Sequence, residues 1–271
     1  MKTALLLSTY NWPEALNSVL KSLAAQTVLP SEVIIADDGS GKSTREVISQ
    51  FRKKLAIPVK HIWQKDKGFR KSAILNKALA QSSADYIIQI DGDCIMHKDF
   101  IRDHLARAES GVFLFGSRVN IKPEVVKKIL NLDKVQFTPF SSSIKNKTRN
   151  IRIPAFQEFY KPKSDFSEKT RGCNLSYWRE DFLSVNGYDE AMEGWGREDS
   201  EFVIRLLNKN IKGKRLRYGG IVYHIYHPEK SKEFVKANSE IQQRTIKENK
   251  QWCQNGVAKY LAQNSMNKPI E

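Results

Sequence analysis

Two carboxylates one position apart, Asp91 and Asp93, are the sharpest chemical signal in this chain, and Gly92 separates them on a predicted turn. Hard divalent cations such as Mn²⁺ and Mg²⁺ prefer oxygen ligands and usually share them with substrate phosphates. One carboxylate could therefore bind a cation while the other binds a hydroxyl group. Such triplets also occur in ordinary turns. The position of this one, directly after the apolar run 86–90, favours a functional role.

A second acidic pair, Glu198 and Asp199, follows Gly194-Trp195-Gly196 and opens a segment with apolar residues at helical spacing. The amide groups at a helix N-terminus can orient a carboxylate, and an oriented carboxylate can take the proton of an attacking hydroxyl group. Trp195, placed on a flexible turn, can stack on a ring of a bound ligand and help to exclude water. The alternative is that the acids only stabilise the helix and that Trp195 only anchors the core.

Two histidines, His224 and His227, lie three positions apart before Pro228 and are the candidate nitrogen ligands for a cation. Side chains three positions apart in a strand project to opposite faces unless the strand bends, and Pro228 favours such a bend. We favour His224 as the ligand and keep His227 as the second candidate.

The first 115 residues alternate between apolar runs and segments of helical periodicity. The predicted strands are 3–9, 32–40, 59–64 and 85–93, and the predicted helices between them cover 14–25, 47–55 and 70–82. This order predicts an α/β fold with a mostly parallel central sheet and helices on both faces. In such open sheets, ligands bind beyond the carboxyl ends of the strands.

Polar residues gather where these predicted strands end. Thr9 ends the first strand, Asp38 the second, and a cationic loop that includes Arg70 follows the third. With Asp91 and Asp93 at the end of the fourth strand, one rim would carry carboxylates, a hydroxyl group and cations. The glycine fingerprint of dinucleotide-binding folds is absent, so we expect no nicotinamide or flavin site.

The second half is less regular. We expect a strand at 111–119, short helices and a mobile loop across 121–171, a short strand and helix within 172–188, and a last strand within 215–229. Residues 231–262 resemble a polar, basic helical tail. The predicted organisation is one catalytic domain at 1–228, divided into halves at 1–115 and 116–228, with a C-terminal extension at 229–271.

The 271-residue chain has a net charge of +15, from 45 Lys and Arg against 30 Asp and Glu. Segments 141–171 and 205–271 hold nearly all of this excess, with eight basic against three acidic residues and fourteen against five. Such segregation favours an anionic partner: nucleic acid, acidic lipid or a phosphorylated substrate. The apolar run near the N-terminus is too short for an export signal and no run has transmembrane length. We therefore expect a cytoplasmic protein that contacts the inner face of the membrane through its basic tail.

Four segments of the first half resemble the successive motifs of inverting family-2 glycosyltransferases, which have the GT-A fold: LLLSTYN, VIIADDGS, WQKDKGFRKSAILNKAL and DYIIQIDGD. Three later segments resemble the acceptor half of bacterial chondroitin polymerase domains and β-1,4-galactosyltransferases: TRGCNLSYWREDF, GYDEAMEGWGREDSEF and GGIVYHIYHPE. The resemblance covers residues 3–228 in the same order, weakens across 120–165 and stops at the tail.

The resemblance implies a UDP-sugar donor. Thr9 and Asp38 match residues that hold the uridine, and Arg70 falls where a basic residue commonly meets the nucleotide. Asp91 corresponds to the acid near the ribose, and Asp93 corresponds to the ligand of Mn²⁺ or Mg²⁺.

On the acceptor side, Glu198 and Asp199 match a Glu-Asp pair whose aspartate deprotonates the acceptor. His224 and His227 both match positions that bind the metal in this group, so both stay candidates. The implied reaction is metal-dependent, inverting transfer to a hydroxyl of a glycan or a lipid-linked saccharide, in bacterial surface polysaccharide or lipopolysaccharide synthesis.

Two other functions compete with this one. A nucleotidyl or phosphoryl transferase would suit the same rim, but it calls for a phosphate-gripping glycine loop after the first strand, and STYNWPEA has none. A nucleic-acid-binding module would explain the net charge. It would leave the clustered acids unexplained, because they repel phosphate, so we expect no nucleic-acid partner.

Overall fold

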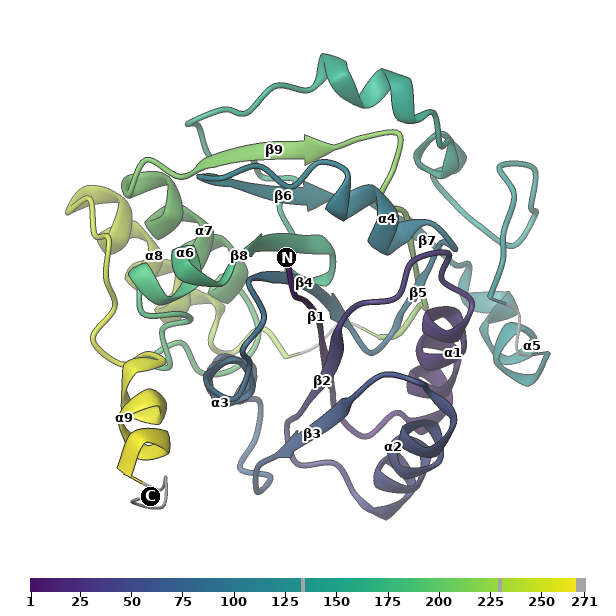
Figure 1. Ribbon diagram of the computed structural model, residues 1–271, viewed down its shortest axis with the longest axis horizontal. Helices are drawn as coiled ribbons and strands as arrows, with labels where there is room; N and C mark the ends of the chain where they lie inside the picture. The colour runs from purple at the N-terminus through teal and green to yellow at the C-terminus, as the bar shows by residue number, and fades with distance from the viewer. Residues whose placement is uncertain (133–134, 229–230, 267–271) are drawn as a thin grey trace.

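The computed structural model describes residues 1–132, 135–228 and 231–266. Its centre is a seven-stranded sheet in the order β3-β2-β1-β4-β8-β6-β9 (Figure 1). The strands are β1 (Thr3–Thr9), β2 (Glu32–Asp37), β3 (Val59–Trp63), β4 (Tyr86–Asp91), β6 (Val112–Gly116), β8 (Leu175–Trp178) and β9 (Lys212–Leu216). Only β8 runs antiparallel to its neighbours, β4 and β6. The predicted mostly parallel α/β sheet is confirmed.

Helices cover both faces of this sheet because the strands are apolar on both sides. On one face lie α1 (Pro13–Ala24), α2 (Lys42–Lys54) and α4 (Phe100–Leu105), with a core built around Leu5, Leu20 and Ile88. On the other face lie α3 (Lys71–Ala80), α6 (Arg179–Ser184) and α7 (Glu198–Asn208), with a core around Leu6 and Phe202. Figure 1 shows the two groups on opposite sides of the sheet.

A second, three-stranded sheet was not expected from the sequence. It has the order β5-β10-β7 and consists of β5 (Cys94–Met96), β10 (Val222–His224) and β7 (Arg118–Asn120). The single last strand predicted within 215–229 is therefore wrong: β9 ends at Leu216 in the large sheet, and β10 begins at Val222 in the small one. Positive φ angles at Tyr218 and Gly220, +63° and +54°, turn the chain between them.

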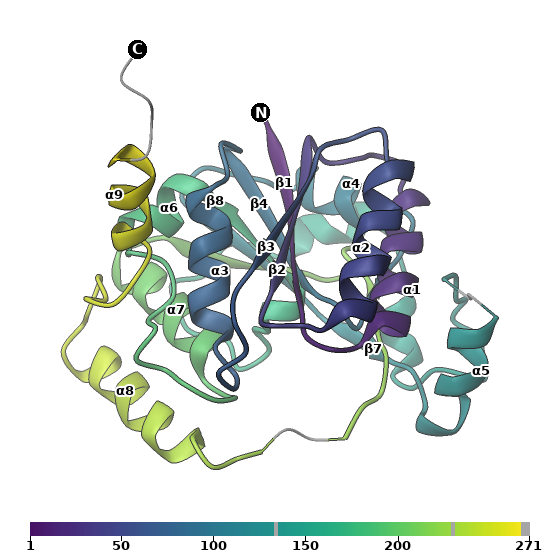
Figure 2. The same ribbon diagram turned by 90° about the horizontal axis from the view of Figure 1, so that it is seen from below.

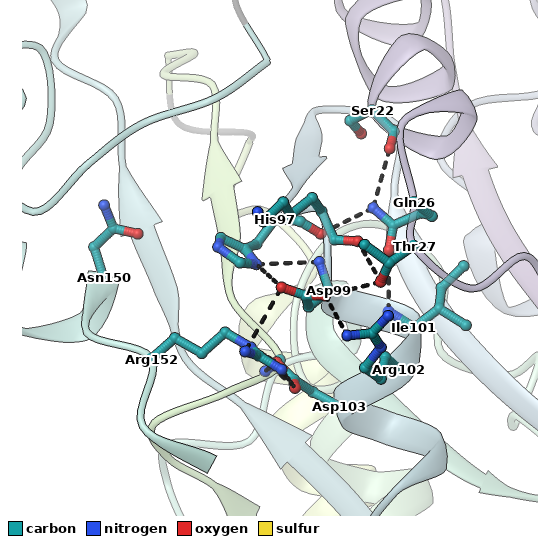
Figure 3. A network of polar contacts seen from close by, with 12 residues as sticks. Ser22, Gln26, Thr27, His97, Asp99, Ile101, Arg102, Asp103, Asn150 and Arg152 are labelled. Atoms are coloured by element: carbon teal, nitrogen blue, oxygen red, sulfur yellow. Dashed lines mark hydrogen bonds and ion pairs between the residues drawn. The ribbon is translucent and has the colours of Figure 1, made fainter.

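The segment after β7 contains the short helices expected of it. They are the 3₁₀ helices η1 (Pro123–Val125), η2 (Lys147–Asn150) and η3 (Pro154–Phe159), and the α-helix α5 (Val126–Asn131). A further 3₁₀ helix, η4 (Gly172–Asn174), follows just before β8. A partly buried ion network ties this segment to α4 (Figure 3). Arg152 donates to both carboxylate oxygens of Asp103 at 2.7–3.1 Å, and its other nitrogen lies 3.6 Å from Asp99.

The C-terminal extension is helical, as predicted, within its described part; residues 229–230 and 267–271 lie outside the described residues. It contains α8 (Val235–Lys247) and α9 (Ala258–Met266). Both helices pack on the catalytic fold, since α8 lies along α7, α9 lies along α3 and Val257 joins the main core. Among the described residues, none of the helices combines the length and apolar character that crossing a bilayer requires.

Candidate active site

A cleft of about 1150 Å³ opens at the carboxyl ends of β1, β2 and β4. In Figure 2, in which β1 runs downward from the N-terminus, this is the lower end of the sheet, and α8 lies at the same end. Eight of the ten predicted site residues line the cleft: Thr9, Asp38, Asp91, Asp93, Trp195, Glu198, Asp199 and His227. The structure therefore brings together residues that are more than 180 positions apart in the chain.

Asp38 is fixed at the inner edge of the cleft and is 6% exposed. Its carboxylate accepts hydrogen bonds from the side-chain amide of Gln64 at 2.5 Å and from the backbone N–H of Arg70 at 2.7 Å. Burial raises the pKa of Asp38, and these two donors oppose the rise. The Arg70 guanidinium instead donates to the carbonyl of Lys65, and Arg70 is not among the residues that line the cleft.

The turn after β4 holds the two aspartates against β1. The N–H of Gly92 donates to the carbonyl of Ser8 at 2.7 Å, and a Cβ at Gly92 would lie 2.9 Å from that oxygen. Asp91 accepts a hydrogen bond of 2.7 Å from the Ser8 hydroxyl. The glycine therefore allows the close approach that puts Asp91 and Asp93 at the end of β1.

Asp93, His224 and His227 form a cluster of metal-ligand type, with ligand atoms that all lie within 4.8 Å of one another. The nearest Asp93 oxygen lies 3.7 Å from Nε2 of His224 and 3.3 Å from Nε2 of His227. The two rings lie close together, with centroids 5.1 Å apart, because β10 ends at His224 and the alternation of a strand does not continue to His227. Three ligands of mixed oxygen and nitrogen type leave coordination positions for substrate oxygens. They suit Mn²⁺ better than Mg²⁺, which favours all-oxygen shells.

The histidines also set the charge state of Asp93. Burial raises its pKa, but the hydrogen bond to His227 and the two imidazoles outweigh burial, and the pKa is lowered. Burial lowers the pKa of His224 despite the Asp93 charge. An ionised carboxylate beside a neutral imidazole is the state in which both groups can bind a cation.

Glu198 and Asp199 lie at the first turn of α7, where Arg197 adopts a φ of +76° just before the helix. One Asp199 oxygen accepts the N–H of Gly172 at 2.9 Å. The other is buried and has no hydrogen-bond partner among the described residues. Burial raises the pKa of both carboxyls, in Glu198 to about 7 with a contribution from the Asp199 charge. An acceptor oxygen held in place beside a cleft and lacking a partner has the geometry of a general base.

Lys71 is a site residue that the sequence reasoning missed. It begins α3, is 12% exposed at its side chain, and its ammonium lies 2.8 Å from the Asp91 carboxylate. Burial lowers its pKa, but the charges of Asp199 and Asp91 outweigh that effect, so the pKa is raised well above its usual value. One feature of the sequence could have indicated this role: a lysine in the first turn of a helix interacts unfavourably with the helix dipole, so a nearby acidic partner is expected.

Trp195 stands at the mouth of the cleft and is 42% exposed. The glycines on both sides have φ angles of +68° and +112°, in the region that favours glycine. The N–H of Gly194 donates to the carbonyl of Phe69 at 3.1 Å, which connects this loop to the start of α3. The indole is thus held at the entrance, where it can cover a bound sugar.

The fold and this rim define a GT-A-type transferase: a mostly parallel sheet with carboxylates and a metal-type cluster at its carboxyl edge. The family model for glycosyl transferase family 2 matches residues 5–166, and the chain belongs to that family. A second model, described as the N-terminal domain of galactosyltransferase, matches residues 154–228.

Known proteins are similar to this chain in sequence and in fold. The chain is 28% identical over 247 residues to a chondroitin synthase of Pasteurella multocida (strain Pm70). The matched region covers 85% of this chain and 25% of that protein. It thus spans about a quarter of that relative's length. The structure of S. aureus TarS 1–349 in complex with UDP-GlcNAc aligns with a TM-score of 0.61 and 17% identity, over 97% of this chain and 71% of that chain. The structure of GalNAc-T7 with UDP, GalNAc and Mn²⁺ aligns with a TM-score of 0.64 and 16% identity, over 91% of this chain and 48% of that chain. At these identities the structural matches show the fold.

Proposed function

We propose that this protein is a metal-dependent, inverting glycosyltransferase that moves a sugar from a UDP-sugar to a hydroxyl group of a glycan or glycolipid. The observation that carries this proposal is that Asp93 and His227, two members of the metal-type cluster, line one cleft with Asp199 at the carboxyl end of the sheet. Inverting transfer needs the leaving diphosphate on one side of the anomeric carbon and the base on the other. The bound UDP-GlcNAc and UDP of the two structural relatives support the choice of nucleotide.

The donor would lie over the ends of β1, β2 and β4. Thr9 and Asp38 bind the uridine, and Asp91 binds the ribose. Arg70 contributes through its backbone N–H, which orients Asp38. Lys71 neutralises the carboxylates beneath the donor, so that a diphosphate can approach them.

Asp93, His224 and His227 would hold Mn²⁺, and the bound ion would supply positive charge for the departing diphosphate. The Mn²⁺ of GalNAc-T7 supports the choice of metal. Asp199 takes the proton of the acceptor hydroxyl as the glycosidic bond forms, and Gly172 keeps its carboxylate in the required orientation. Glu198 accepts a hydrogen bond from the N–H of Gly196 at 2.9 Å and positions the acceptor or a donor hydroxyl. Trp195 covers the sugar and excludes water, which would otherwise compete as acceptor.

A panel of nucleotide-sugars tests this function. Each donor is added with and without Mn²⁺, and both slow donor hydrolysis and the rise in Tm are measured. We expect UDP-sugars to stabilise the protein most and Mn²⁺ to increase the effect. Stabilisation by nucleoside triphosphates but by none of the sugar nucleotides would refute the proposal and favour nucleotidyl transfer.

For the pathway, we propose synthesis of a bacterial surface polysaccharide or lipopolysaccharide, in which the basic extension contacts an anionic membrane from its outward face. Lys236, Arg244 and Lys247 of α8 are exposed and supply cations for such a contact. Co-sedimentation with vesicles that contain phosphatidylglycerol measures it. If a variant with these three residues changed to Ser binds the vesicles as strongly as wild type, the extension does not have this role.

A further inference from the structure

The side chains that helix α8 buries against the catalytic fold are polar. Asn238, Gln242 and Thr245 lie four and three positions apart, on one face of the helix, and each is at most 5% exposed. The Gln242 amide donates to the Ser200 hydroxyl at 2.6 Å, and the Thr245 hydroxyl donates to Glu201 at 2.9 Å. Hydrogen bonds require a defined geometry, so this face fixes the position of α8 along α7.

Asn238 makes the most specific of these contacts, because it binds the backbone on both sides of Trp195. Its side-chain amide donates to the carbonyl of Glu193 and to the carbonyl of Gly196, each at 2.9 Å. The side chain is 1% exposed. One amide group thus closes the loop that presents the indole to the cleft.

The neighbouring residues of the same helical turn pack on the two glycines of this loop. A Cβ added to Gly194 would overlap the ring of Phe234, and one added to Gly196 would lie 3.1 Å from Val235. Three positive φ angles flank the indole, one before it at Gly194 and two after it at Gly196 and Arg197. Such a backbone persists only where surrounding structure holds it, and here α8 supplies that structure.

The helix also reaches the cleft itself. Gln243 and Ile246 line it together with Trp195, and both are exposed. α8 lies beyond residue 228, where the second family match ends. Neither family region therefore includes this wall of the cleft.

On the basis of the proposed function, we propose that α8 is part of the acceptor site and that Asn238 is a positioning residue for Trp195. The ligand on this side of the cleft is a saccharide, whose ring faces suit an indole and whose hydroxyls suit the amide of Gln243. Asn238 acts through the loop and does not touch the sugar.

The test compares Asn238→Ala with Asn208→Ala in the full-length protein. Asn208 also donates two hydrogen bonds to the extension, to the carbonyls of Thr245 and Lys250, but it lies away from the cleft. We expect Asn238→Ala to raise the acceptor KM about tenfold and to increase the ratio of donor hydrolysis to transfer, with the donor KM unchanged. Asn208→Ala should lower Tm similarly and leave the acceptor KM and the ratio unchanged.

A double-mutant cycle separates positioning from a general structural effect. If Asn238 acts through the indole, Trp195→Ala combined with Asn238→Ala should match Trp195→Ala alone in the acceptor KM. Additive effects, or equal acceptor KM values for the Asn238 and Asn208 variants, would overturn the proposal.

Phe234→Ala provides a second variant if Asn238→Ala does not fold, because Phe234 is 39% exposed and its truncation leaves the core intact. It should raise the acceptor KM about threefold in the same direction, and an unchanged acceptor KM in this variant would also overturn the proposal. A wild-type protein that neither binds nor hydrolyses any sugar nucleotide would instead refute the proposed function, so the two failures are distinguishable.

Discussion

The two halves of the cleft are built by different means. On the donor side, Thr9, Asp38 and Asp91 each lie at or next to the end of a parallel strand, and the sheet alone brings them together. On the acceptor side, Asp199 depends on the N–H of Gly172, and Trp195 depends on Asn238 of the C-terminal extension. Donor-side positions therefore follow from local sequence and topology, whereas acceptor-side positions depend on contacts between distant segments.

The largest expected effect is on the acceptor side. Asp199→Asn removes the proposed base but keeps the shape of the side chain, so transfer should fall on the order of 10³–10⁴-fold while donor binding is retained. Initial rates of transfer and donor titration measure the two quantities. Asp181→Asn is the matched control: it is another carboxyl with a buried, unpaired oxygen among the described residues, and its pKa is raised by burial to about 6, but it lies outside the cleft. Full turnover by Asp199→Asn would remove it as the base.

On the donor side, Asp93→Ala should remove the response to Mn²⁺. Loss of a ligand that helps to stabilise the leaving group is expected to lower transfer on the order of 10³-fold and to abolish the rise in Tm with Mn²⁺. Asp165→Ala, an exposed acid, serves as the control. An unchanged Mn²⁺ titration in Asp93→Ala would show that the cluster is not the metal site.

Gly172→Ala tests whether a distant backbone contact sets the acceptor side. A Cβ at this position would overlap the Asp199 carboxylate. A displacement of the base of about 1 Å should lower transfer roughly 10²-fold with little change in the donor KM. Gly41→Ala is the control, since its Cβ would meet only Asn11 at 3.7 Å. Wild-type transfer by Gly172→Ala would weaken the contrast between the two halves.

The raised pKa of Glu198 predicts a pH dependence of stability. Its pKa rises from 4.5 to about 7 in the folded state, because burial and the Asp199 charge disfavour ionisation. The folded state therefore binds the proton more tightly, and this stabilisation is complete below about pH 4.5 and lost as the pH rises through about 7. Glu198→Gln lacks this titration. The free energy of unfolding of the variant minus that of wild type should therefore be larger at pH 8 than at pH 4.5, by on the order of 2 kcal/mol. Urea unfolding at both pH values checks this, with the exposed Glu124→Gln as control; parallel profiles for wild type and Glu198→Gln would contradict it.

The smallest effect is expected at Arg70. Because its guanidinium binds the carbonyl of Lys65 and its backbone N–H holds Asp38, Arg70→Ala should change the donor KM no more than about threefold. Steady-state kinetics with varied donor checks this. A much larger rise in the donor KM would mean that the guanidinium turns to the nucleotide when the donor binds.

The sequence predicted the first strands and the residues at their carboxyl ends well, because that information is local. The apolar runs 3–9 and 59–64 are strands, and the acids that follow the fourth strand lie at the expected edge. The cluster at His224 and His227 was harder to predict, because their convergence depends on a strand of only three residues that pairs with β5 and β7.

Other features could not be predicted because they depend on partners far along the chain. Lys71 has its role through Asp91 and Asp199, which come from β4 and α7. The buried polar face of α8 resembles an ordinary solvated helix in sequence, because Asn238 and Gln242 are polar. Only the position of α7 shows that this face is covered.

One continuous hydrogen-bonded ladder joins the two halves, since β8 pairs with β4 on one side and with β6 on the other. A clamshell motion of one half against the other would have to break that ladder, so we expect the framework to stay rigid during turnover. We then expect the spent nucleotide to leave through movement of the short segment around the indole and of the helix that supports it. The rate of product release, rather than the chemical step alone, would in that case be set by the C-terminal part of the chain.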